Sequence, residues 1–261
     1  LDGLVIEDGK APLGNAAGAI VNEGTLTIRR SRVTTSQGNS GGAIQNSSGA
    51  TLMIEDSTFA QNSAIAGSGG AIISYGVAAT ILRSAFIGNT SSSDGGAIDV
   101  QGGTMTIAGS TFAGNSSTGV GGAIMTFKAM TVVASTFAGN STSSPSQGSA
   151  IFTGAEQTTL AASIIGPQGA GSACKPTLST VIDAGYNLDT DGSCVSASSP
   201  ATGSHAGTAS YGLSTYGAAL GAYLADATAD HGGPTPTIAL LNTPNPATML
   251  ANPAFDAIPA T

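Results

Sequence analysis

The sequence predicts an all-β fold: a right-handed parallel β-helix with about three short strands in each coil of about 26 residues. Two repeated signals carry this prediction. Gly-Gly-Ala-Ile recurs at residues 41–44, 69–72, 95–98 and 121–124, and Phe-x-x-Asn recurs in phase with it. Degenerate copies of the tetrapeptide at residues 17–20 and 148–151 extend the series. The period suits one solenoid coil and is shorter than the roughly 40–45 residues of a propeller blade.

A short alternating pattern lies between the two signals in most periods. It occurs at residues 25–28, 51–54, 104–107 and 129–132, where apolar side chains occupy the second and fourth positions. Alternation with a period of two is typical of a strand with one buried face. Two further strands are predicted in each coil, one containing the repeated isoleucine and one containing the repeated phenylalanine, and Gly, Ser and Asn residues separate the three. No segment has the period of a helix.

Equivalent positions of successive coils stack about 4.8 Å apart in this fold, so each repeated residue predicts a column. The isoleucines predict an inward aliphatic ladder, the phenylalanines an aromatic stack, and the asparagines an amide ladder whose side chains bond to the next coil. We expect structural roles for all three columns, which are Ile44, Ile72, Ile98 and Ile124; Phe59, Phe86, Phe112 and Phe137; and Asn62, Asn89, Asn115 and Asn140.

The repeats place about six coils in residues 1–166. Residues 167–261 are expected to form an irregular region, rich in Pro and Gly, that packs on the β-helix or closes it. Cys174 and Cys194 lie in this region. An even cysteine count in an exported type of chain favours a disulfide between them, and two free buried thiols are the alternative.

The composition excludes several classes of protein. Charged residues are 8% of the chain and the formal net charge is -8, whereas charged residues are about 25% of ordinary soluble domains. Seven scattered cations cannot form the basic surface that nucleic acid requires. No apolar run approaches the roughly 18 residues of a membrane span. No leader is evident before Leu1, so we expect a mature or excised segment of a secreted or bacterial cell-surface protein.

A charged patch is predicted near the N-terminal end of the β-helix. Arg30, Asp56 and Arg83 each directly precede the serine that opens a Phe segment, so they are predicted to form one column. Arg29 and Glu55, one residue earlier, form the next column. One interpretation is a ladder of surface ion pairs that keeps the coils in register. The other is the catalytic site of a lyase or glycoside hydrolase acting on a saccharide. The chain has no Asp-Asp pair of the kind that such a hydrolase would use.

Asn187, Asp189 and Asp191 precede Gly192 with the spacing of half a calcium loop. The distant acidic ligand of such a loop is missing, so an Asx-rich turn beside the disulfide is the alternative. The sequence predicts no cofactor, with calcium at this loop as the alternative.

An apolar strip is predicted on the outside of the solenoid. The position after each Gly-Gly-Ala-Ile points outward, and the position two residues later does too. The strip comprises Ile73, Tyr75, Met125, Phe127 and Phe152. Such a strip is normally covered, either by the protein's own residues 203–261 or by a neighbouring subunit. We therefore expect self-association, end to end or lateral, of a solenoid whose ends lack polar caps.

The alternation of Gly-Gly-Ala-Ile with Phe-x-x-Asn resembles the repeats of bacterial polymorphic outer-membrane proteins. Residues 22–28 and 57–62 are similar to large right-handed parallel β-helix surface proteins, including those with a "choice-of-anchor Q" region. Residues 185–194, 224–226, 230–237 and 252–256 resemble closing segments of that group, with His231 in place of an expected Asn. The resemblance covers roughly residues 4–258 and implies a cell-surface or extracellular role without a specific reaction.

The first functional hypothesis is therefore a non-enzymatic extracellular structural β-solenoid: a surface passenger, an adhesin-like stalk or a filament subunit, with a surface or glycan as a further ligand. The alternative is a polysaccharide-active enzyme that uses the charged patch. A third hypothesis is ice binding by the columns Thr25, Thr51, Thr104 and Thr27, Thr80, Thr106, Thr131, which Met53, Ala78 and Ala129 interrupt.

Overall fold

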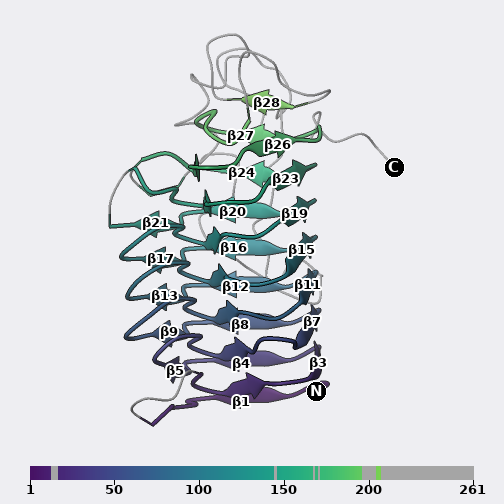
Figure 1. Cartoon of the computed structure of the whole chain (residues 1–261), viewed down its shortest axis with the longest axis vertical. Coiled ribbons are helices and arrows are strands. Elements are labelled where there is room, and N and C mark those ends of the chain that lie inside the picture. Colours follow the sequence, from purple (N-terminus) through teal and green to yellow (C-terminus); the bar gives the residue numbers. More distant parts are fainter. Residues whose placement is uncertain (13–16, 144–145, 167, 170, 196–203, 207–261) are drawn as a thin grey trace, which may run out of the picture.

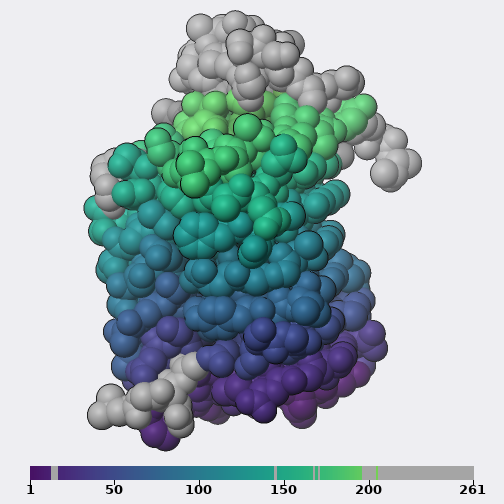
Figure 2. All heavy atoms as spheres, in the orientation of Figure 1, coloured from purple at the N-terminus to yellow at the C-terminus, as the bar shows by residue number. Residues whose placement is uncertain are grey.

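The chain forms a parallel β-solenoid of about seven turns (Figure 1). The structure, a computed structural model, describes residues 1–12, 17–143, 146–166, 168–169, 171–195 and 204–206. These residues form strands, turns and bends and contain no helix. The coils stack along one axis into a continuous column, from β1 at the N-terminal end to β27 and β28 at the other (Figures 1 and 2).

Each complete coil contains four strands, one in each of four parallel sheets. In the second coil these are β6 (Ile44–Asn46), β7 (Thr51–Glu55), β8 (Thr58–Ala60) and β9 (Ser63–Ala64). The three longer strands are the three that the sequence predicts. The fourth has two residues, too few for alternation to reveal, and exists because the residues after each asparagine pair with the same segment of neighbouring coils.

The four sheets are numbered here in the order in which the chain visits them. Sheet 1 contains β2 (Ile20–Asn22), β6, β10 (Ile72–Ser74), β14 (Ile98–Val100), β18 (Ile124–Thr126), β22 (Ile151–Thr153) and β25 (Cys174–Pro176). Sheet 2 contains β3 (Thr25–Arg29), β7, β11 (Ala78–Leu82), β15 (Thr104–Ala108), β19 (Met130–Val133), β23 (Thr158–Ala161) and β26 (Val181–Asp183). Sheet 3 contains β1 (Val5–Glu7), β4 (Arg32–Thr34), β8, β12 (Ala85–Ile87), β16 (Thr111–Ala113), β20 (Thr136–Ala138), β24 (Ile164–Ile165), β27 (Leu188–Asp189) and β28 (His205–Ala206). Sheet 4 contains β5 (Gln37–Gly38), β9, β13 (Thr90–Ser91), β17 (Ser116–Ser117) and β21 (Ser141–Thr142).

The core consists of stacked columns of identical or similar side chains. The ladder isoleucines pair residue for residue in sheet 1 and are fully buried. The four phenylalanines stack face to face, with ring centroids 5.1, 4.9 and 4.8 Å apart and interplanar angles of 8° or less. The ring spacing follows the spacing of the strands, which holds the rings in parallel rather than edge-to-face contact.

An amide ladder occupies the turn between sheets 3 and 4. Asn115 is typical: its Oδ1 accepts bonds from the backbone N and the Nδ2 of Asn89, and its Nδ2 donates to the carbonyl of Phe86. Asn89 and Asn140 repeat this arrangement. Asn62 begins the ladder: its Nδ2 donates to the carbonyl of Val33, and its Oδ1 accepts from the backbone N of Ser36. Gln168 continues it by accepting both donors of Asn140. All four asparagines are fully buried, and each links its own coil to both neighbours.

A serine ladder, which the repeats do not predict, joins the coils at the turn between sheets 2 and 3. The Oγ of Ser57 accepts a bond from the backbone N of Ser31 and donates to the carbonyl of Glu55. The same pair of bonds recurs at Ser31, Ser84, Ser110, Ser135 and Ser163. The hydroxyl is both donor and acceptor, so one small side chain satisfies two buried backbone groups in each coil.

The residue before each of these serines adopts a left-handed backbone conformation. Asp56, Arg83 and Ala134 have φ of 49°, 45° and 48°, and Gly109 has 59° in the same column. The left-handed conformation strains any residue that has a Cβ and leaves glycine unstrained.

Replacing Ala134 by Gly is therefore expected to raise the free energy of unfolding by about 1 kcal/mol. Urea unfolding measures the change. The matched control is Ala113→Gly in β16, where φ is not left-handed and the same substitution should destabilise by about 0.5–1 kcal/mol. A loss of stability in Ala134→Gly would contradict the strain argument.

The sheets continue beyond residue 166, the predicted end of the repeats. β25, β26 and β27 extend sheets 1, 2 and 3 by a further coil. Cys174 pairs with Ile151 and so takes the place of isoleucine in the aliphatic ladder. The predicted disulfide is confirmed, since Cys174 bonds to Cys194. Both cysteines are buried in the core cluster, so the disulfide fastens the chain across the last coil.

Candidate functional site

The charged patch is a chain of ion pairs across three coils. Arg29 Nε lies 2.9 Å from Glu55 Oε2, and Arg83 Nε lies 2.7 Å from Asp56 Oδ1. Arg83 also contacts Glu55, and Arg30 contacts Asp2. The first cause of the raised pKa of Arg83 is its hydrogen bond to Asp56, and the second is its bond to Glu55. The structure thus brings together four of the five residues predicted for this patch.

The two acids of the patch are bound by the same guanidinium. Glu55 and Asp56 are adjacent in the chain and both bond to Arg83. A glycoside hydrolase needs one carboxyl that donates a proton and a second that acts as base or nucleophile. Here both carboxylates are acceptors of arginine bonds, an arrangement that holds neighbouring coils in register.

A shallow hollow of about 370 Å³ adjoins this patch, lined by residues 3–5, 30–32, 56 and 58. Arg32 stands in β4 at this hollow with its side chain exposed. The hollow lies over the edge of sheet 3, where β1 pairs with β4 alone.

The residues suggested for calcium are engaged by hydrogen bonds. Asn187 Oδ1 accepts from the backbone N of Ser163. Asp189 Oδ2 accepts from the backbone N atoms of Cys194 and Val195, and Asp191 Oδ2 accepts from that of Ala173. In the part of the chain that the structure describes, no group of three or more His, Cys, Asp or Glu side chains could hold a metal ion. The three side chains thus cap the last coil through these bonds, and calcium binding stays a prediction.

Asp189 is buried inside this cap. Burial, and then the charge of Asp191, raise its pKa from 3.8 to about 7, while its backbone hydrogen bonds act in the opposite direction. The protonation state of the cap therefore changes near neutral pH.

The apolar strip divides into a buried column and an exposed column. Ile73, Met125 and Phe152 follow the ladder isoleucines in sheet 1 and are only 3%, 2% and 9% exposed. Tyr75 and Phe127 lie two residues further along, at the turn into sheet 2, and are 43% and 40% exposed. The expected cover, residues 203–261, lies outside the described residues except for 204–206, so that prediction stays open.

A buried carboxyl, Asp99, stands between Ile73 and Met125 in the buried column. Its two oxygens accept bonds of 2.8 and 3.0 Å from Gln101 Nε2. Burial raises its pKa from 3.8 to about 7; bonds from Gln101 and Ser68 lower it, and the charge of Asp94 raises it. Asp99 follows the Gly-Gly-Ala-Ile of residues 95–98, so the sequence predicts only that it points outward.

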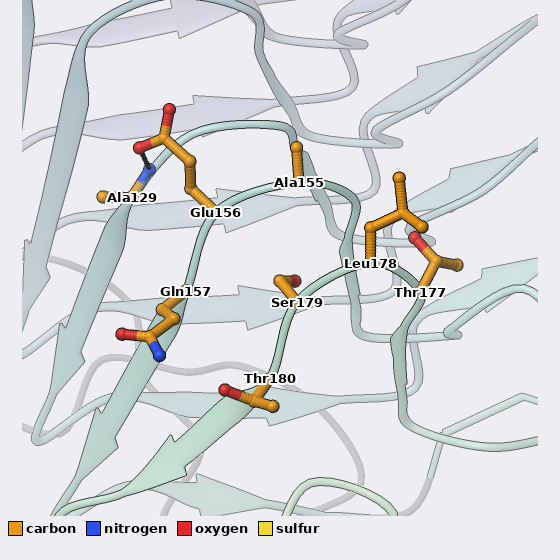
Figure 3. A pocket seen from close by; sticks show the side chains of 8 residues that line it. All are labelled: Ala129, Ala155, Glu156, Gln157, Thr177, Leu178, Ser179 and Thr180. Atoms are coloured by element: carbon orange, nitrogen blue, oxygen red, sulfur yellow. Dashed lines mark hydrogen bonds between the residues drawn. The ribbon is translucent and has the colours of Figure 1, made fainter.

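A second hollow lies at the turns between sheets 1 and 2 of the last coils (Figure 3). Its volume is about 670 Å³, and it is lined by Ala129, Ala155, Glu156, Gln157, Thr177, Leu178, Ser179 and Thr180. We call this site the turn hollow. Glu156 accepts a bond from the backbone N of Ala129 and pairs with Lys128 at 3.2 Å. Leu178 is 87% exposed.

A change in turn length creates the turn hollow. The turn between sheets 1 and 2 has three residues at 101–103 and 127–129 but four at 154–157 and 177–180. In the sequence the longer turns appear only as a slight lengthening of the repeat period. The structure shows that two such turns stack on each other and line the hollow.

The threonine columns lie on the outer face of sheet 2. Thr27, Met53, Thr80, Thr106 and Thr131 align in register there. Met53 therefore interrupts the column in the structure as it does in the sequence.

No helix in the described part of the chain is long and apolar enough to cross a membrane.

Two stretches of the chain, residues 83–101 and 109–126, match the Chlamydia polymorphic membrane protein repeat. They cover the coils in which the isoleucine, phenylalanine and asparagine columns are most regular. No curated protein and no solved structure matches the chain. The solenoid fold and the two matching stretches fit a surface protein whose repeats are similar to those of polymorphic membrane proteins.

Proposed function

We propose that the protein is a non-enzymatic structural element of the bacterial surface or the secreted space, a stiff solenoid that acts as a passenger, an adhesin-like stalk or a filament subunit. The observation that carries the proposal is the set of serine and asparagine ladders, which satisfy buried backbone groups from one coil to the next along the whole column. Networks of this kind, fully satisfied, rigidify a core.

The electrostatics of the charged patch also support a structural role. Both of its acids are bound by arginine. A carboxylate that is held in this way stabilises the coil beneath it and is poorly placed to exchange a proton with a substrate.

Surface biotinylation of intact cells that produce the protein tests its location, with a cytoplasmic enzyme as the control for leakage. Labelled chain in the surface fraction is expected. Incubation of the purified protein with neutral and anionic polysaccharides tests the alternative of a lyase or hydrolase. Unsaturated products or new reducing ends that disappear in Glu55→Gln would overturn the non-enzymatic proposal.

Self-association through the edge of sheet 3 is the second part of the proposal. Among the described residues β1 pairs only with β4, and Leu4 and Val5 are 42% and 67% exposed. An exposed strand edge with apolar side chains favours pairing with another chain. Sedimentation velocity should show dimers or larger species that grow with concentration, and Val5→Lys should abolish them. A monomer at all concentrations would contradict self-association.

A further inference from the structure

Exposed aromatic side chains recur in one column at the turn between sheets 1 and 2. Tyr75, Gln101 and Phe127 each follow directly on a strand of sheet 1, and their backbone N atoms bond to the preceding coil in the same register. The column continues through Gly154 to Thr177. Tyr75 and Phe127 are 43% and 40% exposed, although large aromatic side chains elsewhere in the repeats are stacked inside the core.

The Phe127 ring has a defined support. A Cβ added at Gly154 would lie only 2.4 and 2.7 Å from Cδ1 and Cε1 of this ring. The ring therefore lies against the backbone of the next coil, at a position where only glycine leaves room for it. A ring held in this way can offer a face to a ligand with little loss of side-chain entropy.

The distance between the two aromatic positions follows from the fold. Tyr75 and Phe127 are two coils apart, which corresponds to about 9.6 Å along the solenoid axis. This distance is close to the length of a disaccharide unit in an extended β-linked glycan. Tyr75 and Phe127 can therefore each contact one of two sugars that are two positions apart in the same glycan.

Hydrogen-bonding groups lie along the same line. Between the rings, Gln101 uses its Nε2 on Asp99, which leaves its Oε1 as an acceptor. Beyond Phe127 the turn hollow presents Gln157, Ser179 and Thr180, with Glu156 and Leu178 toward its opposite ends (Figure 3). From Tyr75 to the turn hollow the line spans four coils, about 19 Å, enough for an oligosaccharide of several residues.

The charges on this line cancel. Lys128 and Glu156 pair with each other, and Asp99, the carboxyl that Gln101 binds, is only 1% exposed, so the line offers little accessible charge to an ionic ligand. Apolar faces together with hydroxyl and amide groups suit an uncharged ligand with both CH-rich faces and hydroxyl edges, which is the chemistry of a neutral sugar.

From this juxtaposition we infer that the column Tyr75–Gln101–Phe127 and the turn hollow form one binding site for an extended neutral glycan that lies along the solenoid axis. The sugar rings stack on Tyr75 and Phe127, and the turn hollow binds the end of the glycan through hydrogen bonds. The inference adds a ligand to the proposed surface role but rests on its own geometry.

Calorimetric titration of the full chain with neutral β-linked hexasaccharides, cellohexaose and chitohexaose, tests the inference. At least one of them is expected to bind. Tyr75→Ala and Phe127→Ala should each weaken association about tenfold, since an aromatic contact adds to the area that it buries. Phe127→Leu keeps the apolar character but removes the ring face, and it should weaken association nearly as much, whereas Phe127→Tyr should retain binding.

Val21→Ala is the matched control, because Val21 is also an exposed apolar residue, 50% accessible, in sheet 1 but off the aromatic line. It should leave binding unchanged. The inference is overturned if neither hexasaccharide binds, if Phe127→Leu binds as well as the unmodified protein, or if only hexagalacturonate binds and salt abolishes that binding. None of these results would alter the biotinylation result, so the glycan site and the surface role fail separately.

Discussion

Replacing Asn115 by Ala is expected to lower the free energy of unfolding by about 4 kcal/mol, because it leaves several buried groups without partners. The backbone N and the Nδ2 of Asn89 lose their shared acceptor, and the carbonyl of Phe86 loses its donor. Asn115 is fully buried, so water cannot replace these bonds without entering the stack.

Urea unfolding followed by circular dichroism measures this loss. Asn39→Ala is the matched control, because Asn39 is only partly buried and its side chain forms no hydrogen bond that the structure records among the described residues. It should change stability by less than about 0.5 kcal/mol. Asn115→Asp separates the two halves of the ladder, since the carboxylate still accepts but no longer donates to Phe86. Equal stability of Asn115→Ala and Asn39→Ala would show that the ladder contributes nothing.

The protein is expected to become more stable as the pH falls from 8 to 5. The pKa of Asp99 is about 7 in the folded state and near 3.8 when the carboxyl is free in water. Between these values the folded state holds a proton that the unfolded state has released, so the free energy of unfolding rises as the pH decreases. At about 1.4 kcal/mol per unit of pKa, about 3 kcal/mol of the effect of this residue develops between pH 7 and pH 5. Asp189, whose pKa is also raised to about 7, acts in the same direction.

Urea unfolding at pH 5 and pH 8 tests the prediction. Asp99→Asn should raise stability at pH 8, because a neutral amide replaces a buried charge and can still accept from Gln101. It should also leave a smaller pH dependence, due to Asp189. Glu23→Gln changes an exposed carboxyl and should leave the pH profile as it is. A protein that is less stable at pH 5 than at pH 8 would contradict the assignment of both buried carboxyls.

The exposed and the buried acids of the molecule therefore differ in kind. The charged patch is exposed and paired across coils, and pairs of this kind contribute about 0–1 kcal/mol each. Asp99 and Asp189 are buried beside other acids, and they make stability depend on pH. The two buried acids are thus expected to affect stability more than the larger number of charges in the exposed patch.

The sequence by itself determined the repeat and everything that follows from stacking it. The isoleucine, phenylalanine and asparagine columns need only a constant period, because equivalent residues of successive coils then meet at the strand spacing. The disulfide could be predicted because there are two cysteines and few alternatives for them.

Only the tertiary structure decided what depends on the neighbouring coil. The serine hydroxyls, the left-handed residues before them and the two-residue strands of sheet 4 become visible once backbone donors and acceptors of adjacent coils are placed together. Asp99 occupies an outward position in the alternation yet is 1% exposed. Asp189 and Asp191 bond to backbone N atoms of the last coil, which their spacing in the sequence does not reveal. Alternation specifies which face of a strand a side chain occupies, but burial, pKa and the space between two long turns depend on what the adjacent coils present to it.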